Sequence, residues 1–159
     1  MTKIQCNPVV PLNLILLLLC TAAEAQDAIV VAHADVSISE ITSAELRDIF
    51  TGEHSFFREG SRAVPVLLKG GPAHEVFLHH HIRETSDSFR ARWRKAVFTG
   101  QGAAPKEFAS EEELLQYVAI TRGAIGYVSH VHSGENVKVL VVRSKNATKS
   151  SRTPPVVHP

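Results

Sequence analysis

The residues best suited to chemistry follow a short apolar run and read Lys69-Gly70-Gly71-Pro72-Ala73-His74. Alternating apolar residues predict a strand over 64–68, and Pro72 fits the first turn of a helix, where no backbone N–H is needed. Such a helix start presents free N–H groups and a positive partial charge. We therefore predict an anion site made by the N–H groups of Gly70, Gly71 and Ala73, the charge of Lys69 and the side chain of His74. The alternative is a tight left-handed turn that only lets the helix pack on a sheet.

A second glycine turn, Thr99-Gly100-Gln101-Gly102, follows the Trp-containing helical pattern. The hydroxyl of Thr99 and the N–H of Gly100 are candidates for the same anion. The alternative is an ordinary helix C-terminus followed by a turn.

Four histidines, His74 and His79-His80-His81, lie in or near the same predicted helix. A helical metal site favours two histidines at i and i+4, and no two of these four histidines have that spacing. A solvated helix end explains the run, so we predict no metal site and no cofactor. The cysteines, Cys6 and Cys20, both fall within the first 25 residues and supply no ligand to the rest of the chain.

Enzyme motifs are missing from the sequence, which has neither a G-x-S-x-G elbow nor a P-loop. We therefore predict that the protein is not an enzyme. The formal net charge of +1 argues against nucleic acid as a main partner. The basic run 90–95 alternates with apolar helical positions and indicates a solvated helix face.

The first 25 residues have the features of a secretory signal peptide. Lys3 precedes the apolar run 12–19, and Ala23-Glu24-Ala25 forms an A-x-A cleavage site. We expect export to the periplasm and a mature chain that starts at Gln26, with a retained signal anchor as the alternative. Removing 25 of 159 residues leaves 134, enough for one domain.

The remaining patterns predict the elements that must position these turns. Apolar runs predict strands over 28–33, 64–68, 124–128 and 137–142. Capping boxes and apolar spacing predict helices over 42–51, 72–82, 85–98 and 110–122. Alternating strands and helices favour an α/β fold with a mixed, mostly parallel sheet flanked by helices. We expect one domain over 26–142, followed by a basic, proline-bearing, disordered tail over 143–159.

Several of these segments resemble the phosphate transporter substrate-binding proteins of the periplasm, which have the type II periplasmic binding protein fold. The resemblance rests on four segments of the sequence. They are residues 43–52, which match "L-x-x-I-F-x-G", and residues 60–66, 93–100 and 113–118. Its most specific part is Gly123-Ala124-Ile125-Gly126-Tyr127. It implies one lobe of that fold, whereas full-length members have two. It also places the Lys69 turn where members carry a phosphate-binding "S-G-T" segment, although the hydroxyls are replaced here.

The resemblance implies an exported solute-binding protein for phosphate or a related oxyanion. The alternative is a single-lobe envelope interaction or sensor module with no small-molecule ligand. The expected partners are a small anion, an envelope transporter or sensor, and a second copy that supplies the other lobe as a homodimer.

Overall fold

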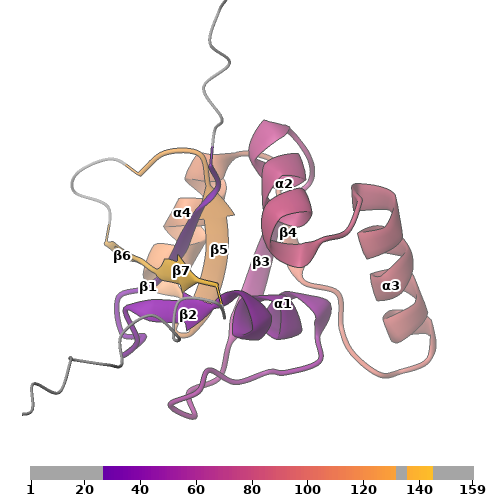
Figure 1. Cartoon of the computed structure of the whole chain (residues 1–159), viewed down its shortest axis with the longest axis horizontal. Helices are drawn as coiled ribbons and strands as arrows, with labels where there is room; N and C mark the ends of the chain where they lie inside the picture. The colour runs from indigo at the N-terminus through magenta and orange to yellow at the C-terminus, as the bar shows by residue number, and fades with distance from the viewer. Residues whose placement is uncertain (1–26, 132–135, 145–159) are drawn as a thin grey trace, which may run out of the picture.

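The apolar runs form the centre of a five-stranded sheet in a computed structural model that describes residues 27–131 and 136–144. The strand order is β4-β3-β5-β1-β6 (Figure 1). These strands are β1 (Ile29–His33), β3 (Val64–Leu68), β4 (Lys106–Phe108), β5 (Ala124–Val128) and β6 (Val137–Val139).

The sheet is mixed. Strand β3 pairs in parallel with β4 and β5, and β1 is antiparallel to β5 and β6. A separate parallel pair joins β2 (Glu40–Thr42) to β7 (Val141–Arg143). Three of these five pairings are parallel, which confirms the expected mixed, mostly parallel arrangement.

Helices cover both faces of the sheet (Figure 1). They are α1 (Ser43–Thr51), α2 (Pro72–Phe77), the π-helix η1 (Leu78–Ile82), α3 (Ser86–Phe98) and α4 (Glu111–Ile120). Neighbouring residues of β5 define the two sides, because side chains alternate along a strand. Gly126 faces Leu114 of α4, whereas Tyr127 stacks on Phe77 of α2 with ring centroids 3.8 Å apart.

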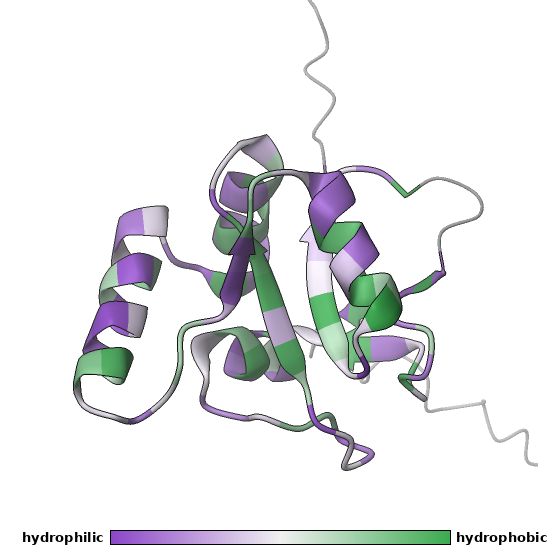
Figure 2. Ribbon diagram, turned by 180° about the vertical axis from the view of Figure 1, so that it is seen from behind, coloured by the Kyte–Doolittle hydropathy of each residue, from purple (hydrophilic) through white to green (hydrophobic). Residues whose placement is uncertain are grey.

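Helix α3 stands to one side of the body and buries only Phe89 and Trp93 (Figure 1). The indole Nε1 of Trp93 donates to the carbonyl oxygen of Phe50 at 3.2 Å, which ties α3 to the end of α1. Figure 2 shows that the last turn of α3 is hydrophobic although it lies at the outside of the ribbon. Val97 and Phe98 in that turn are exposed.

The structure corrects four details of the predicted elements. The single helix predicted over 72–82 changes at Leu78 into a π-helix, in which the N–H of Arg83 donates to the Leu78 oxygen at 2.7 Å. Strands β2 and β4 lie where no strand was predicted. The strand predicted over 137–142 divides at the buried Leu140 into β6 and β7, which belong to different sheets.

The described helices include none long and apolar enough to cross a membrane. Strand β7 ends at Arg143, one residue beyond the predicted domain end at 142. The predicted leader and nearly all of the predicted tail lie outside the described residues.

Candidate functional site

The turn between β3 and α2 has an open backbone. Lys69, Gly70, Gly71 and Pro72 are exposed, and a Cβ atom added at either glycine meets no heavy atom within 4 Å. Gly71 has φ 99° and ψ 173°, a conformation that is essentially restricted to glycine. The sequence therefore places glycine where the chain must reverse and where a ligand can approach the backbone.

Helix α2 begins without a side-chain cap, and in this it differs from the three other described α-helices. Thr42, Thr85 and Ser110 each accept a hydrogen bond from a backbone N–H of the helix that they cap. Gly71 has no side chain to do so. Within the part of the chain that the structure describes, the N–H groups of Gly70, Gly71 and Ala73 donate to no protein acceptor. These N–H groups can donate to an anion without breaking a hydrogen bond within the protein.

His74 lies beneath the turn, with its side chain directed to the sheet. It is 3% exposed, and its Nδ1 lies 2.6 Å from the hydroxyl of Tyr127. The N–H of Leu68 donates to the same hydroxyl at 3.2 Å, so the hydroxyl proton is available to Nδ1 of a neutral imidazole. Burial lowers the pKa of His74 and thus favours this neutral form. The His74 side chain therefore supports the turn from below instead of lining it.

Thr99 and Gly100 lie apart from the Lys69 turn, at the other end of α3. Arg90, near the start of α3, reaches the turn with Nη2 3.2 Å from the Lys69 oxygen. Thr99 comes nine residues after Arg90, a distance of about 13 Å along the helix axis. The hydroxyl of Thr99 donates to the Lys95 oxygen at 2.9 Å, and the N–H of Gly100 donates to the Val97 oxygen at 3.1 Å. Both groups are used to end the helix.

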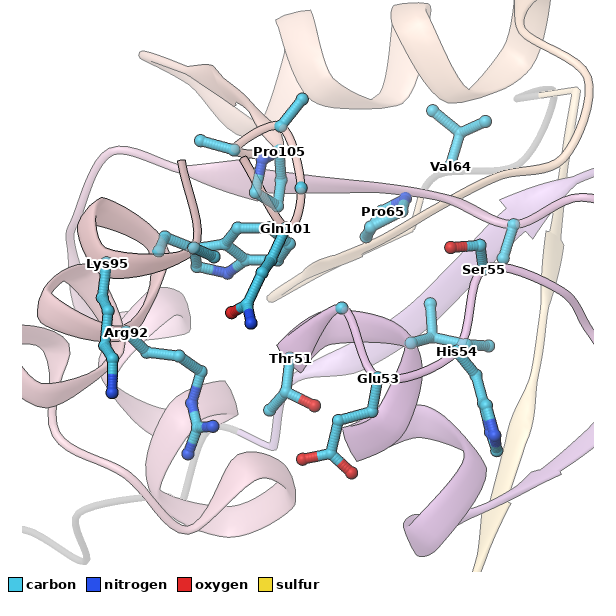
Figure 3. Close-up of a pocket in the computed structure, with 18 of the residues that line it drawn as sticks. Thr51, Glu53, His54, Ser55, Val64, Pro65, Arg92, Lys95, Gln101 and Pro105 are labelled. Atoms are coloured by element: carbon cyan, nitrogen blue, oxygen red, sulfur yellow. The ribbon is translucent and has the colours of Figure 1, made fainter. Parts of the chain in front are cut away.

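A hollow of about 880 Å³ lies between α1 and α3, and no sequence motif indicates it (Figure 3). Its lining includes Pro65 and Lys106, at the amino ends of β3 and β4, so it lies at the opposite end of these strands from the Lys69 turn. Arg92 borders it, but its guanidinium is paired with Glu84, which raises the pKa of Arg92. Ligands of open α/β sheets usually bind at the carboxyl ends of the strands, where the turn is.

The histidine run forms no cluster for a metal. Among residues 27–131 and 136–144, no three His, Cys, Asp or Glu side chains are placed to hold a metal ion. His80 instead lies 3.7 Å from the carboxylate of Asp27, and the ring of His81 packs on Phe77.

Solved phosphate-binding proteins share this fold. A phosphate ABC transporter substrate-binding protein from Clostridium perfringens, solved with bound phosphate, is 16% identical over 73% of the chain, with a TM-score of 0.58. An ABC-type phosphate transport receptor from Vibrio cholerae is 12% identical over 73%, with a TM-score of 0.55. PstS from Borrelia burgdorferi is 16% identical over 81%, with a TM-score of 0.52.

The likeness is one of fold. The chain spans 44%, 46% and 49% of these three structures, which is less than half of each. No protein-family model and no curated protein matches the sequence. The similarity confirms the expected architecture, a single α/β lobe of the periplasmic binding protein kind.

Proposed function

We propose that the protein is an exported solute-binding protein that holds phosphate or a related oxyanion at the Lys69 turn. The observation that carries the proposal is the uncapped start of α2, where three backbone donors with no protein acceptor among the described residues lie beside a lysine. The fold adds support, since the similar structures include one solved with phosphate. Binding is non-covalent, and no residue needs to act as a nucleophile.

Each part of the turn has a separate role in the proposed site. The N–H groups of Gly70, Gly71 and Ala73 donate to the anion oxygens, and Lys69 supplies a full positive charge. Gly71 lets the backbone approach the anion, because no side chain covers it. His74 and Tyr127 hold the end of β3 and the first turn of α2 in position from below.

Isothermal titration of the exported protein with phosphate and with sulfate tests the site. We expect Lys69→Ala to weaken binding by about tenfold or more, because a charge-assisted bond contributes about 1.5–3 kcal/mol. Lys95→Ala is the matched control, since it removes an equal charge from an exposed position on α3. No heat with phosphate, sulfate or related oxyanions would overturn the proposal, as would equal losses in the two variants.

The competing function is an envelope interaction module that binds a transporter or sensor and no small molecule. Two observations favour it. Lys69, Gly70 and Gly71 line neither the hollow of about 880 Å³ nor two others found among the described residues, and the chain spans less than half of the similar structures. Phosphate released by denaturing the purified protein would exclude this reading; protein that carries no phosphate and is not stabilised by it would favour the module.

A further inference from the structure

The outer side of α3 carries an exposed aromatic residue beside an apolar hollow. Phe98 is 93% exposed and Val97 is 50% exposed. The hollow next to them has a volume of about 460 Å³. Its apolar lining is formed by Leu67, Phe89, Trp93, Val97, Phe98, Ala104 and Pro105. An exposed aromatic ring at the edge of such a hollow is typical of a protein–protein contact.

The rim of this hollow carries both signs of charge. Arg94 and Glu107 line it, and within the described part of the chain neither forms an ion pair or a side-chain hydrogen bond. Arg94 lies one helical turn before Phe98, on the same side of α3. Glu107 lies on β4, which is an edge strand of the sheet. An arginine and a glutamate with no ionic partner among the described residues therefore share one face with a protruding ring and a hollow.

We propose that this face binds a second copy of the chain in a two-fold symmetric dimer. A two-fold axis places the same face of each copy against the other. The projection of each copy therefore meets the hollow of its partner, and this contact occurs twice in the dimer. Phe98 of each copy then enters the hollow of its partner, and Arg94 of each copy meets the partner's Glu107. Two copies of this surface can pair the arginine of each with the glutamate of the other. A strongly acidic or basic partner would leave one of the two charges unmatched.

The contact is independent of the proposed anion site. It uses the side chains of α3 and β4 and needs no bound ligand. A failure to bind phosphate would therefore not contradict the proposed dimer, and a monomeric protein would not contradict the proposed anion site.

Sedimentation equilibrium of the exported protein between about 1 μM and about 1 mM measures the dimer. We expect Phe98→Asp to raise the dimer dissociation constant by about 100-fold or more, because each dimer loses the ring twice and gains two buried charges. Ile120→Asp is the matched control, since Ile120 is 81% exposed at the end of α4, outside this face. We expect it to dimerise as the parent does. Phe98 makes little contact within its own copy, so circular dichroism should show both variants folded.

Exchanging the charges tests the two-fold geometry. Arg94→Glu and Glu107→Arg each place like charges at both contacts of a dimer, so each variant alone should dissociate. A mixture of the two variants should form a heterodimer, because opposite charges then meet at both contacts. A parent protein that stays monomeric throughout the range would overturn the proposal. So would single variants that dimerise normally, a mixture that remains monomeric, or a dimer that Phe98→Asp leaves intact.

Discussion

Tyr127 connects three parts of the fold through one hydroxyl group. The hydroxyl accepts from the last residue of β3 and lies 2.6 Å from His74 in the first turn of α2, while its ring stacks on Phe77. Burial raises the pKa of Tyr127, so the group keeps its proton and donates it to the imidazole. The arrangement requires a neutral His74. The support beneath the Lys69 turn therefore depends on a histidine that does not protonate readily.

The free energy of unfolding should fall as the pH falls below about 6.5. Burial lowers the pKa of His74 and His81 in the folded protein below their ordinary value of 6.5. Between the lowered values and 6.5 the unfolded chain binds more protons than the folded one, so acid favours unfolding by up to about 1.4 kcal/mol per pH unit for each histidine. Above 6.5 this contribution is fully present.

Urea unfolding at several pH values measures this dependence. His74→Asn keeps an acceptor for the Tyr127 hydroxyl but does not titrate, so its unfolding free energy should fall less between pH 7.5 and pH 5.5. His79→Asn, at an exposed position two residues before His81, should follow the parent protein. An equal slope in the parent and in His74→Asn would contradict the assignment.

Only part of the turn between β3 and α2 could be predicted from the sequence. Its strand, its glycines and its proline start were all predictable, because each has a local steric reason. The position of His74 was not, since its partner Tyr127 lies 53 residues away in the sequence. His74 was predicted as a candidate ligand, and its side chain is instead buried against the sheet.

The two glycines of this turn should respond very differently to alanine. Gly71→Ala forces a Cβ into a backbone conformation with φ 99°, which we expect to cost about 1–3 kcal/mol of stability. Gly70→Ala should change stability by less than about 0.5 kcal/mol, since φ at Gly70 is not in the left-handed range. Neither new methyl group meets a neighbour, so the difference reports backbone strain alone. Chemical denaturation of both variants provides the measurement, and equal stabilities would refute it.

The most specific sequence segment, Gly123 to Tyr127, has a structural explanation in this fold. A Cβ at Gly123 would lie 2.1 Å from the Arg62 oxygen, and one at Gly126 would lie 2.8 Å from Leu114. These glycines allow the loop before β3 and helix α4 to approach β5 closely. The segment therefore marks the fold, and its presence does not by itself support a ligand.

At the scale of the whole chain, strands with strong apolar patterns were predictable and short paired strands were not. Strand β4 has two charged residues out of three, and its pairing with β3 makes it a strand. The run 137–142 has no turn residue to show that it divides. It divides because Leu140 is buried while β6 pairs with β1 and β7 pairs with β2. These choices depend on contacts between distant segments, which a local pattern does not contain.

The C-terminal boundary of the domain gives a final prediction. Strand β7 completes a parallel pair with β2, and the N–H of Val141 donates to the Ser39 oxygen at 3.0 Å. Arg143 is ion-paired with Glu40, and its oxygen accepts from the Ser43 hydroxyl at 3.3 Å, at the start of α1. A chain cut after Leu140 loses all of these contacts and leaves β2 unpaired. We expect it to lose about 2 kcal/mol or more.

A chain cut after Ser144 is the matched control, because it keeps β7 and removes only the predicted tail. We expect its free energy of unfolding to remain within about 0.5 kcal/mol of the parent value. Thermal and urea unfolding of both truncations, each expressed from the same N-terminus as the parent, make the comparison. A large loss in the longer truncation would show that the tail stabilises the domain. No loss in the shorter one would show that β7 contributes nothing. Because β7 holds the start of α1 through Ser43, the shorter truncation should also weaken the packing of α1 on η1, which hydrogen exchange in α1 would detect.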